Sequence, residues 1–351
     1  MKKERLEQFN FLRVVFCLWV VFHHYENFFG ECPFSHLFPA GDVCYVGRLG
    51  VEFFFMLSGF MISYNYYDII VRFSLFSFLK KRFRRLYPVL LFSMLLMIGI
   101  QVWDKALGQE GQLTIFSIFS SALLVNSGWF FYNEFGSLTN WFSNVLLLCY
   151  CIWYFLSKNL EHKYYRLGCM LFFSLGISFG SRYLDIPFLY SNSCRGYLAF
   201  FMGCLLYEIY QNVPKDFLEK YSIVFVLLSI TLLFLRLFYP HPLGGDETMV
   251  VFFLPTLIMS FLYSKPIIKF TKKKIFNKLS QYTMCIFLTH EFVMEVLLRV
   301  PFIQNFNYST WYIFLMVIIF IFIFAILTHT LIEKKLSDLL WRKLFEKGQI
   351  Y

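Results

Sequence analysis

The chain has 351 residues and a formal net charge of +10, and 58% of its residues are hydrophobic while only 15% are charged. A soluble domain carries about 25% charged residues, so a chain this apolar cannot cover itself with polar groups, which excludes soluble and disordered proteins. The basic residues form short clusters between apolar runs, which indicates cytoplasmic loops of a membrane protein and no nucleic-acid partner.

Ten stretches of mostly apolar residues have about the length of 20 residues that a membrane-spanning helix needs. In chain order they cover residues 9–29, 47–67, 86–103, 141–157, 167–181, 195–211, 221–238, 249–264, 279–299 and 310–332. We therefore expect membrane lipids to surround most of the chain.

The stretch 113–127 is apolar but short, and the distribution of basic residues along the chain decides whether it spans the membrane. If it does not, 25 of the 32 Lys and Arg residues gather on one side of the membrane, in the N-terminus and in residues 68–85, 158–166, 212–220, 265–278 and 333–351. The positive-inside rule assigns that side to the cytoplasm. We predict that 113–127 is re-entrant or interfacial and that both termini are cytoplasmic.

These features predict an all-α fold, a polytopic membrane helix bundle of about ten transmembrane helices. Residues 1–332 form its transmembrane domain, and residues 333–351 form a cytoplasmic tail. Basic and apolar residues alternate around the tail segment from Glu333 to Leu344, which predicts an amphipathic helix on the inner leaflet.

The nine cysteines are scattered and show no zinc-finger spacing. Cys149 and Cys151 point to different faces of a helix, so the sequence predicts no metal site. Cys32 and Cys44 share one outside loop, where a disulfide and two separate thiols both fit the spacing.

Ionisable side chains at membrane depth are costly and often functional. Arg13 and His24 lie eleven residues apart in the first span, which places them on one helix face, about 16 Å apart along the axis. His23 points about 100° away from that face and is a candidate supporting residue. A snorkelling arginine with a hydrogen-bonded core histidine is an equally simple interpretation at this point.

Two further spans contain charges. The second opens with the small-residue segment Gly50–Phe60, in which Glu52 is the charged exception and can pair with Arg48 one turn away. In the ninth, His290 sits beside Glu291 at mid-span, an arrangement that is rarely inert, although a helix contact alone can also account for it.

Five cations fall within the six residues 80–85, before the third span. Such a cluster serves as a topology signal, and it can equally hold a polyanionic ligand because arginine forks match phosphate geometry. The sequence alone leaves both interpretations open.

Together these segments resemble the membrane-bound acyltransferase 3 family, bacterial O-acetyltransferases that modify sugars of surface polysaccharides. Arg13 and His24 resemble its arginine–ten residues–histidine signature, and Gly50–Phe60 resembles its glycine- and phenylalanine-rich segment. The resemblance covers about the whole chain and includes Arg82 to Arg85 followed by Tyr-Pro, Trp141 to Tyr150, and Leu279 to His290.

Three positions differ from the family pattern. Asn10 stands where many members carry an aspartate, Leu146 where many carry a glutamate, and Phe287 where the late helix carries a tyrosine. The roles of those carboxylates are then absent or filled by other acidic residues, such as Glu26, Glu52 or Glu291.

The resemblance implies an acyltransferase that moves an acetyl group from cytoplasmic acetyl-CoA, an acyl-donor substrate, to a hydroxyl of an extracytoplasmic or lipid-linked glycan. It implies a multi-pass protein of the bacterial cytoplasmic membrane. His24 would act as general base or accept the acetyl group, with Arg13 assisting. The other expected catalytic residues are His23, Glu52, Ser58 and His290.

The resemblance also suggests that Arg82 and Arg85, with Arg84 and Lys81 beside them, bind the CoA phosphates. The partners would be the acyl-CoA donor and a glycan or glycolipid acceptor, and no metal is expected. The alternative is a transporter or flippase for a lipid-linked saccharide, whose buried His, Arg and Glu line a pathway without acyl transfer.

Overall fold

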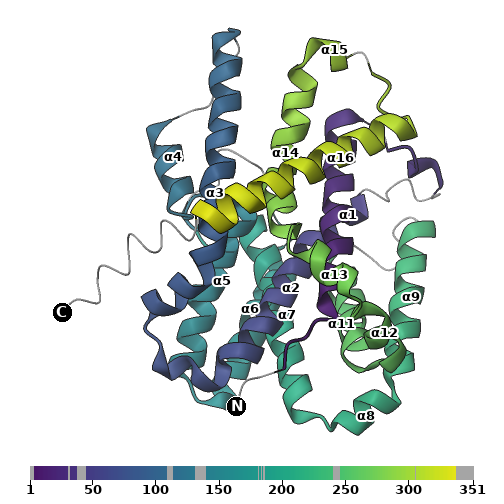
Figure 1. Cartoon of the computed structure of the whole chain (residues 1–351). Coiled ribbons are helices and arrows are strands. Elements are labelled where there is room, and N and C mark those ends of the chain that lie inside the picture. Colours follow the sequence, from purple (N-terminus) through teal and green to yellow (C-terminus); the bar gives the residue numbers. More distant parts are fainter. Residues whose placement is uncertain are drawn as a thin grey trace.

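The computed structural model describes residues 4–30, 32–37, 45–108, 114–130, 140–180, 182, 184, 186–239, 246–304 and 306–336. Within these ranges the regular elements are all helices, which confirms the all-α fold (Figure 1). The tail from residue 337 onward and Cys44 lie outside the described residues, so the amphipathic tail helix stays a prediction and the choice between a disulfide and two separate thiols at Cys32 and Cys44 stays open.

The N-terminal half contains seven α-helices and three 3₁₀ segments among the described residues. The helices are α1 (Phe9–Phe29), α2 (Leu49–Tyr66), α3 (Leu75–Ala106), α4 (Ile115–Ala122), α5 (Asn140–Asn159), α6 (His162–Phe179) and α7 (Ser191–Asn212). The 3₁₀ segments are η1 (Ser35–Leu37), η2 (Tyr45–Arg48) and η3 (Tyr67–Arg72).

The C-terminal half begins with four short or medium helices, α8 (Lys215–Lys220), α9 (Ser222–Phe238), α10 (Asp246–Thr248) and the π-helix η4 (Met249–Phe253). It continues with α11 (Leu254–Tyr263), α12 (Lys265–Thr271), α13 (Lys274–Ser280), α14 (Thr283–Arg299), α15 (Pro301–Gln304), α16 (Trp311–Thr328) and the π-helix η5 (His329–Leu336).

The start of α3 differs from the sequence expectation. The helix begins at Leu75 after the cap Ser74, whose hydroxyl accepts a hydrogen bond from the backbone N–H of Ser77 at 3.2 Å. Residues 80–85 are therefore helical and continuous with the third span, whereas the sequence predicted a loop. A side-chain cap at Ser74 supplies the helix start that hydropathy alone does not reveal.

Among the described residues, two helical stretches are by themselves long and apolar enough to cross a membrane, Leu86–Ala106 and Trp311–Leu336. A third qualifies if Met249–Tyr263 and Lys265–Thr271, which meet at 84°, count as one span. Charged residues such as Arg13 lower the mean hydropathy of other predicted spans. The structure supports a membrane protein with apolar helices, and the number of ten spans stays a prediction.

Helices α9 and α16 present large apolar side chains on the outside of the bundle. Such faces are costly in water and fit contact with lipid tails. Their exposed side chains include Ile223, Leu227, Ile230, Phe234, Ile319, Phe320, Ile323 and Leu327.

Helices α2 and α7 approach each other closely through two glycines. A Cβ atom on Gly59 would lie 1.9 Å from the backbone oxygen of Phe200, and one on Gly203 would lie 2.0 Å from that of Met56. The absence of side chains at both positions lets the two backbones touch, as small residues do in membrane helix pairs.

Helices α1 and α14 pack against each other. Figure 1 shows α16 running obliquely across both. The ring of Phe314 in α16 contacts the rings of Phe22 and Tyr25 in α1. This packing fixes the α1–α14 interface, where the predicted histidines lie.

Candidate active site

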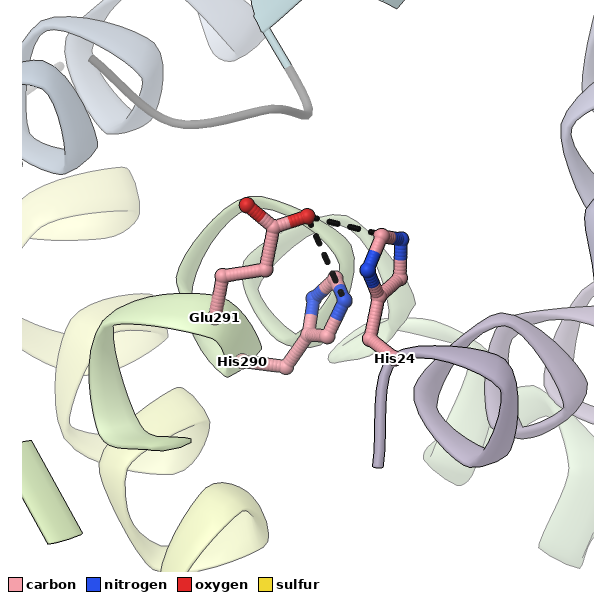
Figure 2. Close-up of side chains that lie close together, drawn as sticks. All are labelled: His24, His290 and Glu291. Carbon is pink, nitrogen blue, oxygen red and sulfur yellow. Dashed lines mark ion pairs between the residues drawn. The ribbon is translucent and has the colours of Figure 1, made fainter. Parts of the chain in front are cut away.

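The side chains of His24, His290 and Glu291 meet between α1 and α14, as Figure 2 shows. The Nε2 atom of His24 lies 3.4 Å from Oε1 of Glu291, and Nε2 of His290 lies 4.0 Å from the same oxygen. The centroids of the two imidazole rings are 5.0 Å apart. His290 and Glu291 are buried, whereas 15% of the His24 side chain is exposed, so His24 forms the accessible side of the cluster.

One hydrogen bond of His290 indicates which ring nitrogen carries the proton. Its Nδ1 atom lies 3.0 Å from the backbone carbonyl of Ile286. A carbonyl oxygen only accepts, so Nδ1 is the donor and Nε2 faces Glu291. Among the described residues, Nε2 of His290 and Nδ1 of His24 are buried without a hydrogen-bond partner. Buried nitrogens of this kind are available to a bound substrate.

The same three residues have the donor types of a metal site. Each offers one ligand atom, and these atoms lie within 4.8 Å of one another. The sequence predicted His290, and it marked Glu291 as its neighbour and as one of the acidic residues that could replace the missing family carboxylates. An acidic residue at membrane depth is the signal that marks Glu291.

Arg13 belongs to a polar chain at the other end of this face. Its Nη1 donates to Oδ1 of Asn10 at 2.9 Å, and Nδ2 of Asn10 donates to Oδ1 of Asn277 at 2.6 Å. The amide of Asn277 in turn donates to Oε2 of Glu7 at 3.2 Å. Asn10 therefore orients Arg13 without a charge of its own, and the carboxylate of this chain is that of Glu7.

A cavity of about 190 Å³ lies beside Arg13 and Ser58. Its wall is mostly apolar and includes Leu146 and Phe287, two of the three positions where the chain differs from the family pattern. The Phe287 ring lies 6.4 Å from the His290 ring, centroid to centroid. The full lining is Arg13, Phe54, Ser58, Leu86, Phe142, Ser143, Leu146, Thr283, Met284, Phe287 and Leu288.

Arg13 and His24 both face α14, as their spacing predicted. Arg13 lines the cavity together with α14 side chains, and His24 contacts Glu291 on the same helix. The structure thus brings His24 together with His290, and Arg13 together with Ser58. Phe287 links the two groups.

Glu52 occupies a separate ion pair. Its Oε1 atom accepts from Nε of Arg195 in α7 at 2.7 Å and lies 2.6 Å from Nη2. The Arg195 guanidinium also stacks over the Trp141 ring at 4.7 Å. The sequence proposed Arg48 as a structural partner and missed Arg195, because a contact between residues 52 and 195 leaves no local spacing signal.

His23 lies beside the cluster. Its Nε2 atom is 3.2 Å from Nδ2 of Asn27, and its ring centroid is 5.2 Å from that of His24. It therefore packs against the candidate base without sharing its contact with Glu291.

The predicted phosphate-binding cations lie along the first turns of α3. The Arg82 guanidinium stacks over the Tyr66 ring at 4.1 Å, and Nζ of Lys81 lies 4.4 Å from the Phe73 ring centroid. Lys81 and Arg84 are exposed, and Arg82 is partly buried. The side chain of Arg85 lies outside what the structure describes.

A family model described as an acyltransferase domain matches residues 6–330. A Rhizobium radiobacter protein named "Protein 2 in picA locus" is 34% identical over 107 residues, which are 30% of this chain and 50% of that protein. The chain thus spans about half the length of this curated relative. No solved structure matches it. Because the family match covers nearly the whole chain, including the α1–α14 cluster, this protein belongs to the membrane-bound acyltransferase 3 family.

Proposed function

We propose that this acyltransferase is an O-acetyltransferase of the bacterial cytoplasmic membrane, with about ten spans and both termini in the cytoplasm. It would move an acetyl group from cytoplasmic acetyl-CoA to a hydroxyl of an extracytoplasmic or lipid-linked glycan. The observation that carries the proposal is the partly exposed His24 imidazole, held 3.4 Å from the buried carboxylate of Glu291.

His24 has the orientation of a general base. We assign the proton of His24 to Nε2, which lies 3.4 Å from Oε1 of Glu291, because an ionised carboxylate only accepts hydrogen bonds; the lone pair then resides on Nδ1. Nδ1 has no hydrogen-bond partner among the described residues. It would take the proton of the sugar hydroxyl, while Glu291 stabilises the imidazolium that forms.

In the proposed transfer, Nδ1 of His24 is the protein atom that accepts and returns the proton. The hydroxyl oxygen attacks the thioester carbonyl, the carbon–sulfur bond breaks, and the CoA thiolate recovers the proton from Nδ1 of His24. The buried His290 ring packs beside His24, with its Nε2 4.0 Å from the same carboxylate oxygen. The products are an acetyl ester and free CoA.

The basic turns of α3 are the proposed binding site of the CoA phosphates. Arg82 is held in place by its stacking on Tyr66, while Lys81 and Arg84 keep their charges exposed. Arginine forks suit phosphate oxygens. The thioester arm would extend past Arg13 through the apolar cavity toward His24.

The full-length protein in liposomes, supplied with acetyl-labelled acetyl-CoA and a lipid-linked glycan extract, tests this function. We expect CoA release that depends on the acceptor, and label in an alkali-labile ester. A transporter or flippase would give neither product. That result would contradict the proposal.

Charge reversal tests the donor site. Arg82→Glu with Arg85→Glu should raise the KM for acetyl-CoA by about tenfold or more, because two charge-assisted phosphate contacts are lost. Lys215→Glu with Lys265→Glu is the matched control, since both lysines are exposed and pair with Glu219. An unchanged KM in the arginine variant would leave these residues with a topological role alone.

A further inference from the structure

A second buried cluster lies on α14, outside the candidate active site. Cys285 of α14 donates its thiol hydrogen to Oε2 of Glu333 at 3.3 Å, and Nδ1 of His329 lies 2.6 Å from the same oxygen. All three side chains are buried. Their ligand atoms lie within 4.8 Å of one another.

The local fold of η5 directs two of these groups to one point. His329 and Glu333 lie four residues apart in a π-helix, a rare form that is frequent at functional sites. The Tyr282 ring packs edge-on against the His329 ring at 5.0 Å between centroids. Nε2 of His329 is buried and lacks a hydrogen-bond partner among the described residues.

We propose that Cys285, His329 and Glu333 bind one divalent metal ion of the zinc class. Thiolate sulfur, imidazole nitrogen and carboxylate oxygen are the ligands that zinc takes in proteins. Binding would release the thiol proton of Cys285 to solvent. The thiolate and the carboxylate together then neutralise the two charges of the ion, which suits a buried site of low dielectric.

The net charge with a divalent ion bound distinguishes this cluster from the one that contains His24. Two imidazoles and the single carboxylate of Glu291 would leave a bound divalent ion with a net charge of +1. The cluster of Cys285, His329 and Glu333 leaves none, so burial favours metal binding there.

The two distances to Glu333 agree with small ligand movements. Tetrahedral ligands at zinc–ligand distances of 2.0 to 2.3 Å lie about 3.4 Å from each other. The contact of 3.3 Å between Cys285 and Glu333 is already close to that separation. The contact of 2.6 Å between His329 and Glu333 must open by several tenths of an ångström.

A metal at this position would join the beginning of α14 to η5, the last helical element that the structure describes. Cys285 precedes His290 by five residues on α14. The ion would therefore hold the helix that carries His290 and Glu291. Sequence spacing gives no sign of the site, because Cys285 and Glu333 are 48 positions apart.

Cobalt spectroscopy on the full-length protein tests the proposal. The metal-stripped protein in detergent is titrated with Co²⁺, and we expect about one ion per chain with a thiolate-to-cobalt absorption band in the near ultraviolet. Cys285→Ser should remove the band. Cys17→Ser is the matched control and should keep it, because Cys17 is also buried and also contacts α14, at the Thr283 carbonyl.

Further outcomes decide between the two clusters. Glu291→Gln should leave the band unchanged, whereas Glu333→Gln should weaken Co²⁺ binding by at least tenfold. Mass spectrometry of the purified wild-type protein should find zinc at about one ion per chain. A wild-type protein without the cobalt band, or a band that survives Cys285→Ser, would overturn the proposal. Neither result depends on acyl transfer.

Discussion

The His24–Glu291 pair between α1 and α14 and the His162–Glu208 pair between α6 and α7 combine the same residue types in different surroundings. Glu208 also accepts a hydrogen bond of 2.8 Å from Nε of Arg166, and 45% of the His162 side chain is exposed. Glu291 instead faces two imidazoles and is itself buried.

This difference separates a structural ion pair from a candidate proton relay. An arginine that is always charged neutralises Glu208, so protonation of His162 changes little in that pair. The histidines facing Glu291 can gain and lose protons, and burial makes each change in charge matter more. The same two residue types therefore suit catalysis in one place and helix packing in the other.

We expect the largest effect on kcat from removing the charge of Glu291, with the same change at Glu208 as the comparison. Glu291→Gln should lower kcat by roughly 10²- to 10⁴-fold, because the proton-accepting form of His24 loses its orienting carboxylate. Glu208→Gln should leave kcat within about twofold and affect only the melting temperature. Equal losses of kcat in both variants would remove the distinction between the pairs.

A smaller effect is expected at the polar chain that holds Arg13. Arg13→Gln should reduce kcat/KM for acetyl-CoA by about ten- to a hundredfold, because one charge-assisted contact at the cavity is lost. Arg182→Gln is the control, since Arg182 is exposed outside the cavity. If the Arg13→Gln variant has wild-type kinetics, Arg13 contributes to helix packing alone and not to binding of the donor.

The smallest effect is expected on stability alone, from a substitution at the contact between α2 and α7, away from the candidate active site. Gly59→Ala should destabilise the protein by about 1 to 3 kcal/mol, because its Cβ would collide with the Phe200 backbone. Gly99→Ala in α3 is the matched control, because no atom lies within 4 Å of its added Cβ. Alanine there should be neutral or stabilising by helix propensity. Thermal melting in detergent measures both, and a Gly59→Ala variant as stable as wild type would contradict the close α2–α7 contact.

Local geometry explains what the sequence could predict. The shared face of Arg13 and His24 follows from helix periodicity within one span. The apolar stretches likewise predicted the all-α fold, since hydropathy is a property of neighbouring residues.

Contacts between distant segments could not be predicted in this way. Glu291 reaches His24 across 267 positions, and Arg195 reaches Glu52 across 143. Nothing in the spacing of either residue encodes its partner, because packing of whole helices brings them together. The short cap at Ser74 similarly extended α3 beyond its apolar part and made the basic cluster helical.

The most direct test of the central claim compares two histidine variants in the labelled acetyl-CoA assay. His24→Ala should abolish ester formation while expression and membrane insertion stay normal, because the proposed proton acceptor beside Glu291 is lost. His162→Ala, which removes the histidine of the other pair, should retain transfer within about twofold. Normal ester formation by His24→Ala would contradict the assignment of His24 as the general base and, with it, the proposed mechanism.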